Sequence, residues 1–186
     1  MTKTKKLTLC AIMVAFATVL AMVSKIIPAP WLQGGSVTFA SMVPIIAVSV
    51  IVDCRWGMLT AVTYALIQML TGFYPPPTQN FLNFFLVIFL DYILAFGVLG
   101  TAGFFYKLFG KKNVAIAVSG AIVTFLRYVC HILSGLLIWG VYAPAGQSVW
   151  AYSVIYNGTY MVPEIIITVI CLTVITPFLS KSKNQL

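Results

Sequence analysis

Charged residues are rare in this sequence, so those that interrupt long apolar stretches are the first candidates for chemistry. Only 8% of the residues are charged, and 61% are hydrophobic. Asp91, Arg127 and Glu164 lie inside apolar runs, and His131 is the single histidine of the chain. In a membrane-spanning run, a charge near the bilayer centre costs roughly 2.5 to 3.5 kcal/mol on insertion scales. We therefore expect these side chains to face partners or a wet cavity rather than lipid.

The stretch RYVCHILSGLLIWGVYAP, residues 127–144, arranges several of these residues at helical spacing. Residues four apart share one face of a helix. The residues at this spacing are Arg127, His131, Gly135 and Trp139. This face would present a cation, an imidazole, a gap without a side chain and an indole. A packing interpretation remains open, in which Gly135 admits a neighbouring helix, Trp139 belongs to the interfacial aromatic belt and Arg127 pairs with Asp91.

Polar residues of two other stretches are predicted to reach the same depth. Asp91 lies about eleven residues into its helix and His131 about eight from the outer end of its own, so at ~1.5 Å per residue they differ by about one turn. Asn157 adds an amide donor and acceptor, and Tyr152 lies nearer the outer end. Carboxylate, imidazole, amide, phenol and indole together favour a flat, cationic, aromatic ligand, since a desolvated cation over a ring gains about 2 kcal/mol.

Catalysis is not indicated by the sequence. It contains no nucleophile elbow, no phosphate-binding loop and no cluster of His and Cys with metal-ligand spacing. We therefore predict a protein that is not an enzyme and has no catalytic residue, metal or cofactor.

The elements that position these residues are predicted to be membrane helices. With 186 residues and a mean hydropathy of +1.04, the chain is too apolar for a soluble globule and too long for one crossing. A crossing takes roughly 20 helical residues. We predict an all-α integral membrane protein in which residues 1–186 form one six-helix bundle. The expected helices cover about 7–27, 37–53, 57–73, 80–106, 113–139 and 151–179.

Basic residues indicate the orientation of this bundle. Positive charges favour the cytoplasmic side of a membrane protein. In the six-helix arrangement, Lys25 falls on one side and the remaining basic loop and terminal residues fall on the other. These are Lys3, Lys5, Lys6, Arg55, Lys107, Lys111, Lys112, Lys181 and Lys183. Both termini are therefore predicted to be cytoplasmic.

Several stretches along the chain also carry a family resemblance. They are QGGSVTFASMVPI, RWG, LDYILAF, RYVCHILSG, WGVYAP and AYSVIYNGTYMVP. Through them the sequence resembles the thiamine-specific substrate-binding (S) component of energy-coupling factor (ECF) vitamin importers, over nearly its whole length. The resemblance implies a multi-pass protein in the plasma membrane of a bacterium and high-affinity capture of thiamine from outside. It also implies association with a transmembrane coupling subunit and two cytoplasmic ATPases.

The resemblance further implies roles for particular residues. The thiamine-binding residues would be Asp91, Tyr92, Arg127, His131, Gly135, Trp139, Tyr152 and Asn157. Gly35 and Tyr64 fall at positions where some relatives have a Trp, and Trp31, near Gly35, is a candidate lid residue. Ala11 and Ala15 form a pair of small residues that resembles the surface docking the coupling subunit, although a tight contact within the bundle would give the same pattern.

Two other classes of function remain to be separated from this one. A proton-coupled secondary transporter would also enclose Asp91, Arg127, His131 and Glu164 in a helix bundle, and it would need no ATPase. Against it, the sequence shows no inverted repeat. A structural or chaperone-like membrane protein would bind no small ligand.

Overall fold

The computed structural model describes residues 1–26, 35–110 and 112–184, and within these ranges the chain is helical and contains no strand. Helices α1 (Lys3–Ser24), α2 (Met42–Ile51) and α3 (Cys54–Gly72) come first. A continuous helical segment follows, made of α4 (Phe81–Leu86), η1 (Val87–Leu94), α5 (Ala95–Gly97), η2 (Val98–Thr101) and α6 (Ala102–Leu108). The remaining elements are α7 (Asn113–Leu137), the short 3₁₀ turn η3 (Trp139–Tyr142) and α8 (Val149–Asn184).

Four helical segments of the described chain are long and apolar enough to cross a membrane. They are Lys3–Ser24, Phe81–Leu108, Asn113–Leu137 and Val149–Lys181. Large apolar side chains cover their outer surfaces, with Phe81 88% and Phe178 73% exposed. Such a surface is stable in lipid and not in water. The predicted all-α membrane fold is therefore confirmed, whereas the number of crossings stays a prediction because α2 is short and α3 is less apolar.

Helix α2 forms the centre of the bundle. All ten of its residues are buried, and its sequence MVPIIAVSVI is apolar almost all the way round. A helix without a polar face is stable only when other helices surround it. It contacts α1, α3, α6 and α8. Its Ser49 hydroxyl accepts a hydrogen bond from the Gly103 backbone N–H at 2.8 Å and donates one to the Gly100 carbonyl, which joins α2 to the segment that carries Asp91.

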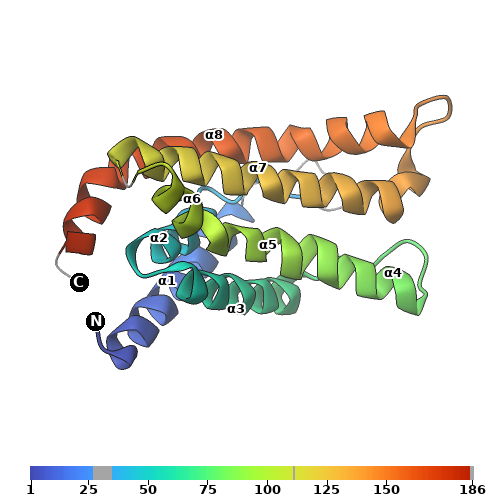
Figure 1. Cartoon of the computed structure of the whole chain (residues 1–186). Helices are drawn as coiled ribbons and strands as arrows, with labels where there is room; N and C mark the ends of the chain where they lie inside the picture. Colours follow the sequence, from blue (N-terminus) through green and yellow to red (C-terminus); the bar gives the residue numbers. More distant parts are fainter. Residues whose placement is uncertain (27–34, 111, 185–186) are drawn as a thin grey trace.

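Helices α7 and α8 lie side by side along most of their length, with the α4 to α6 segment beside α7 (Figure 1). Glycines permit the close approach of these two helices. A Cβ atom on Gly120 would collide with the Leu172 side chain, and one on Gly135 would collide with Ser153. Helix α8 continues through Pro163 and Pro177 and bends in its C-terminal part (Figure 1).

The helix boundaries differ from the predicted ones at two places that matter for the site. Helix α2 was expected from residue 37 but begins at Met42, because residues 35–41 form an extended segment and a turn that contact α8. Helix α7 was expected to reach residue 139 but ends at Leu137. Trp139 therefore belongs to η3, and its indole N–H donates to the Ser134 hydroxyl of α7 at 3.1 Å.

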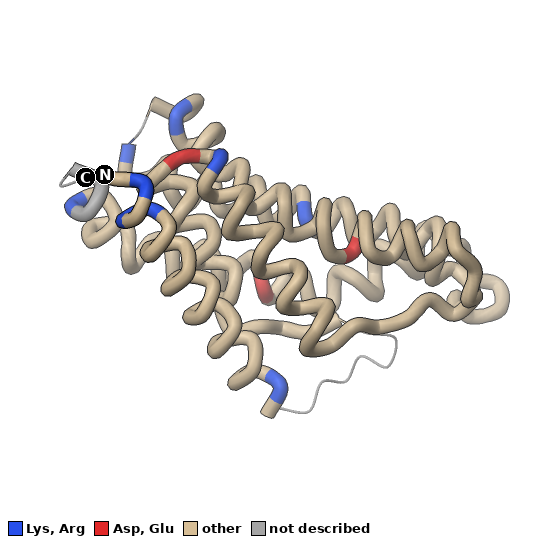
Figure 2. Tube along the Cα trace, turned by 90° about the horizontal axis from the view of Figure 1, so that it is seen from below, with Lys and Arg blue, Asp and Glu red and all other residues tan. Residues whose placement is uncertain are grey.

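The two ends of the bundle differ in charge. Figure 2 shows most Lys and Arg residues gathered where α1 begins and α8 ends. At this end Asp53 caps α3 by accepting hydrogen bonds from the Arg55 and Trp56 N–H groups at 2.8 and 3.1 Å, and it pairs with Lys6 at 3.8 Å. At the opposite end, the Lys25 ammonium donates to the Thr71 carbonyl at 3.1 Å.

Candidate functional site

A cavity of about 620 Å³ lies between α3, the α4 to α6 segment, α7, α8 and residues 35–39. Its volume is in the range of small-molecule sites. All eight residues predicted to bind the ligand line it: Asp91, Tyr92, Arg127, His131, Gly135, Trp139, Tyr152 and Asn157. Gly35 and Tyr64 line it too. Trp31 lies outside the described residues. The structure thus brings these side chains together, and their role toward a ligand stays a prediction.

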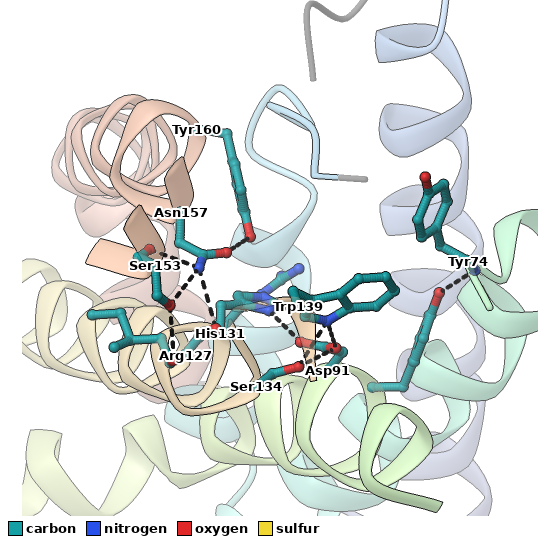
Figure 3. Close-up of polar contacts among 11 residues, drawn as sticks. Tyr74, Asp91, Arg127, His131, Ser134, Trp139, Ser153, Asn157 and Tyr160 are labelled. Carbon is teal, nitrogen blue, oxygen red and sulfur yellow. Dashed lines mark hydrogen bonds and ion pairs between the residues drawn. The ribbon is translucent and has the colours of Figure 1, made fainter. Parts of the chain in front are cut away.

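Asp91 is the polar centre of the cavity (Figure 3). It lies on η1, where the helix widens to a π-helix for two turns. One carboxylate oxygen accepts two hydrogen bonds, one from the Ser134 hydroxyl at 2.5 Å and one from the Trp139 indole N–H at 3.2 Å. The other oxygen lies 3.0 Å from His131 Nδ1. Because a carboxylate has about four lone-pair sites, roughly one acceptor site remains for a ligand.

His131 links Asp91 to Arg127. The Arg127 Nε–H donates to His131 Nε2 at 3.3 Å, so that ring nitrogen is an acceptor. His131 Nδ1 must then carry the proton and donate it to Asp91, which corresponds to a neutral imidazole. The guanidinium of Arg127 also lies over the Phe96 ring, 4.0 Å from its centroid. The direct Arg127–Asp91 pair of the packing interpretation is thus replaced by a chain through His131.

Gly135 admits the neighbouring helix α8, as the packing interpretation expects. The space of its missing side chain is occupied by Ser153 of α8, whose hydroxyl donates to the Ile132 carbonyl at 2.8 Å. Asn157 donates to the His131 carbonyl at 3.2 Å and to the Ser153 carbonyl at 2.8 Å, and it accepts a hydrogen bond from Tyr160. These contacts hold α7 against α8 and orient the amide at the cavity wall (Figure 3).

Aromatic rings cover the opposite side of the cavity. Trp139 lies between Tyr74 and Tyr142, with ring centroids at 5.5 and 6.4 Å. The Tyr92 hydroxyl donates to the Gly72 carbonyl at 3.2 Å and accepts from the Tyr74 N–H at 3.1 Å. Tyr92 therefore fixes the chain after α3, and its hydroxyl is used within the protein.

Several residues of the site were not predicted from the sequence. Ser134, which donates to Asp91 from behind the cavity wall, is one of the small residues of α7, and Tyr74, which lines the cavity, is in a proline-rich loop. Tyr156 and Tyr160 of α8 also line the cavity. The signal that could have found Tyr160 is its spacing of three residues from Asn157, which puts the two on one helix face.

The remaining predicted residues lie away from the cavity. Ala11 and Ala15 are exposed on α1, where they line a groove of about 640 Å³ shared with α3. The rest of this groove is made of apolar side chains and threonines: Leu7, Cys10, Val14, Thr18, Val19, Leu59, Thr60, Thr63 and Ile67. Glu164 is buried on α8, and its carboxylate accepts two hydrogen bonds from Thr38.

Charges of both signs line the cavity or lie beneath it. Asp91, Arg127 and Lys25 line it, and Glu164 is buried beneath it, so two acidic and two basic side chains balance. Lys25 lies at the end of α1 and donates to the Thr71 carbonyl, whereas the Asp91 carboxylate lies among aromatic side chains, where a positive ligand would be attracted to it. No group of His, Cys, Asp and Glu able to hold a metal ion occurs among the described residues.

Known proteins resemble the chain in sequence and in fold. Residues 7–184 match the family described as Thiamine transporter protein (Thia_YuaJ). Thiamine transporter ThiT of Bacillus subtilis is 38% identical over 187 residues, which covers 92% of each chain. Thiamine transporter ThiT of Lacticaseibacillus paracasei is 34% identical over 95 residues, covering 46% of this chain and 47% of the relative.

A solved structure of ThiT from Listeria monocytogenes has the same fold, with a TM-score of 0.75 and 22% identity over 97% of this chain and 98% of that one. The relatives are named as transporters, which are not enzymes. Family match and sequence identity extend over nearly the whole chain, and the apolar helices are those of a multi-pass membrane protein. This chain therefore belongs to the thiamine transporter protein family.

Proposed function

We propose that this protein captures thiamine from outside the cell in the cavity between α3, the α4 to α6 segment, α7 and α8. The observation that carries the proposal is the presence of the Asp91 carboxylate among aromatic side chains in one cavity. Thiamine carries one positive charge and has two aromatic rings joined by a methylene group. Its cation would be attracted to the Asp91 carboxylate, and its rings would contact Trp139 and the tyrosines beside it.

The predicted binding strength is compatible with a cavity of this kind. Nanomolar binding requires about 12 kcal/mol, or roughly 0.7 kcal/mol for each of about 18 heavy atoms, which is below the ceiling for small ligands. Such efficiency requires a site that is formed before the ligand enters. The hydrogen bonds among Asp91, His131, Ser134 and Trp139 supply this preorganisation.

Tryptophan fluorescence tests the binding proposal. Trp139 lines the cavity, so thiamine added to the purified protein in detergent is expected to quench emission with a saturable, nanomolar curve. Substituting Trp139 by Phe should remove most of this quenching while calorimetry still detects binding. A wild-type protein that shows neither quenching nor heat with thiamine would reject the cavity as a thiamine site.

We further propose that transport is driven by ATP through separate subunits. In this proposal the basic end of the bundle is cytoplasmic, as the positive charges favour, and the cavity is reached from the opposite side. A transmembrane coupling subunit docks on Ala11 and Ala15, and two ATPases bind that subunit on the cytoplasmic side. The exposure of both alanines beside an apolar groove supports this docking surface.

Uptake into proteoliposomes separates this mechanism from proton coupling. The chain alone, under a pH gradient, is expected to accumulate no thiamine. Adding the coupling subunit and ATPases with internal ATP should start uptake. Accumulation by the isolated chain under the gradient would instead identify a proton-coupled transporter.

A further inference from the structure

Glu164 is a buried acid that the proposed thiamine contacts do not use. Its side chain lies on α8, and the residue is only 2% exposed. One carboxylate oxygen accepts the Thr38 backbone N–H at 2.7 Å, and the other accepts the Thr38 hydroxyl at 2.7 Å. The Ser41 hydroxyl lies 2.6 Å from the same Thr38 oxygen. A carboxylate thus joins two parts of the chain that are 126 residues apart in sequence.

The segment that Glu164 holds, residues 35–40, forms part of the cavity wall. Residues 35–39 line the cavity directly. The segment is not helical, and its backbone at Phe39 and Ala40 has positive φ angles of 44° and 66°. Residues other than glycine rarely adopt this conformation, which persists only when surrounding contacts enforce it. The two hydrogen bonds from Thr38 to Glu164 are contacts of this kind.

A second contact places the same segment against α8. Gly35 lies so close to the Tyr160 ring that a Cβ atom would come within 2.6 Å of it. Tyr160 and Glu164 are four residues apart and therefore share one face of α8. Tyr160 in turn donates a hydrogen bond to Asn157. The wall segment thus follows one face of α8, with Glu164 at its inner end.

We propose that Glu164 is a positioning residue, which holds the wall segment against α8 and thereby slows the release of bound thiamine. This inference rests on the proposed thiamine site. A carboxylate suits the role because it accepts both Thr38 donors at once, and charge-assisted hydrogen bonds are stronger than neutral ones. Without them the wall segment has fewer contacts to keep its strained turn, and the cavity opens beside the ligand.

Stopped-flow fluorescence of thiamine binding tests this role, with substitutions on both sides of the contact. Glu164→Gln leaves one acceptor and removes the charge, and we expect about a tenfold faster dissociation with an association rate within about twofold of wild type. Thr38→Val removes only the hydroxyl, with an expected increase of about threefold. Thr38→Ser keeps both donors and should retain the wild-type rate.

The double variant Glu164→Gln/Thr38→Val separates positioning from electrostatics. If Glu164 acts through Thr38, thiamine should dissociate from the double variant at a rate within about twofold of the Glu164→Gln rate, because both changes remove the same contact. If Glu164 acts only as a counter-charge for the cation, Thr38→Val would leave dissociation unchanged, and the proposal would be overturned. Thr168→Val is the matched control, since Thr168 is buried one turn further along α8 and should not alter the rate.

Other outcomes distinguish a positioning role of Glu164 from a role in stability alone. A lower melting temperature of Glu164→Gln with unchanged dissociation would assign Glu164 to stability and reject the positioning role. If Glu164→Gln does not fold, the dissociation rates of Thr38→Val and Thr38→Ser test the same contact from the wall segment. Absence of thiamine binding by the wild-type protein would remove the proposed function, and this inference with it. Normal wild-type binding together with unaltered Thr38→Val kinetics would reject the inference alone.

Discussion

Two hollows of nearly equal size occur in this protein, about 620 Å³ for the cavity around Asp91 and about 640 Å³ for the groove between α1 and α3. Their walls have opposite chemistry. The cavity concentrates the acid, imidazole, amide and phenol groups of the membrane segments, joined by hydrogen bonds. The groove is lined by alanines, aliphatic side chains and threonines, and its threonine hydroxyls at positions 18, 60 and 63 donate to carbonyls of their own helices.

This difference separates two kinds of recognition. Polar groups that are costly in a membrane are retained where a polar ligand can satisfy them. Small residues on an apolar helix surface instead permit another helix to approach, because in lipid the association of helices depends on close packing. The comparison predicts that substitutions in the groove affect transport alone, whereas substitutions in the cavity affect binding.

The largest effect is expected from Ala15→Trp in the groove. An indole at this exposed position would fill the groove and prevent a helix from approaching α1, so ATP-dependent thiamine uptake should be abolished. Thiamine binding in detergent should remain within about twofold of wild type. Ala11→Trp should behave in the same way. The measurements are uptake in proteoliposomes and calorimetry on the same preparations.

Ile12→Trp provides the control for the groove. Ile12 is 58% exposed on α1 but does not line the groove, so uptake should persist. Loss of thiamine binding together with uptake in Ala15→Trp would show that the groove residues support the bundle and are not a docking surface.

Asp91→Asn should cause the largest loss of binding. The amide has nearly the same size but no charge, and it cannot accept all three hydrogen bonds from His131, Ser134 and Trp139 with unchanged geometry. We expect thiamine to bind about 100-fold more weakly, which corresponds to about 3 kcal/mol. Asp53→Asn is the matched control at the other end of the bundle, since Asn also caps helices. Equal affinities of Asp91→Asn and wild type would exclude a charge interaction with the ligand.

Much of the cavity lining could be predicted from the sequence, because its polar side chains interrupt otherwise apolar runs. Periodicity placed His131 and Gly135 on one face of α7, and the depth argument put Asp91 within about one turn of His131, whereas the structure brings the two within 3.0 Å. The packing interpretation of Gly135 was also correct in part, because Ser153 occupies the space beside it.

The parts that the sequence did not predict depend on contacts between distant segments. The π-helical geometry around Asp91 has no signature in the stretch VIFLDYIL. Residues 37–41 continue the apolar pattern of α2, yet the Thr38 backbone bonds to Glu164 and the helix begins later. Local propensity could not reveal this, since the partner is on α8.

Trp139→Ala should weaken thiamine binding by about 2 kcal/mol, or about thirtyfold, because an aromatic contact to a cation and a donor to Asp91 are both lost. Calorimetry measures this directly. Trp150→Ala is the control, since that indole is 59% exposed outside the cavity. A change below a few tenths of a kcal/mol in Trp139→Ala would remove Trp139 from the site.

Gly35→Ala should reduce affinity about tenfold. Its φ angle of +97° is unfavourable for alanine, and the new methyl group would press on the Tyr160 ring and displace the wall segment. Gly110→Ala controls for backbone strain alone, because Gly110 also has a positive φ of 77° but faces open space. Similar binding losses in both variants would point to general backbone strain, and not to the cavity wall.

Tyr92→Phe should have the smallest effect on binding, about threefold. The change keeps the ring stacked on Phe73, with centroids 5.7 Å apart, and removes only the hydroxyl that joins the Gly72 carbonyl to the Tyr74 N–H. Loss of these two bonds releases the chain that carries Tyr74 beside Trp139, so dissociation should accelerate modestly, in line with about 0.7 kcal/mol. Tyr92→Leu, which also removes the ring, should cost more. If Tyr92→Phe instead weakened thiamine as much as Asp91→Asn, the Tyr92 hydroxyl would have to bind the ligand itself, and the cavity would rearrange when thiamine enters.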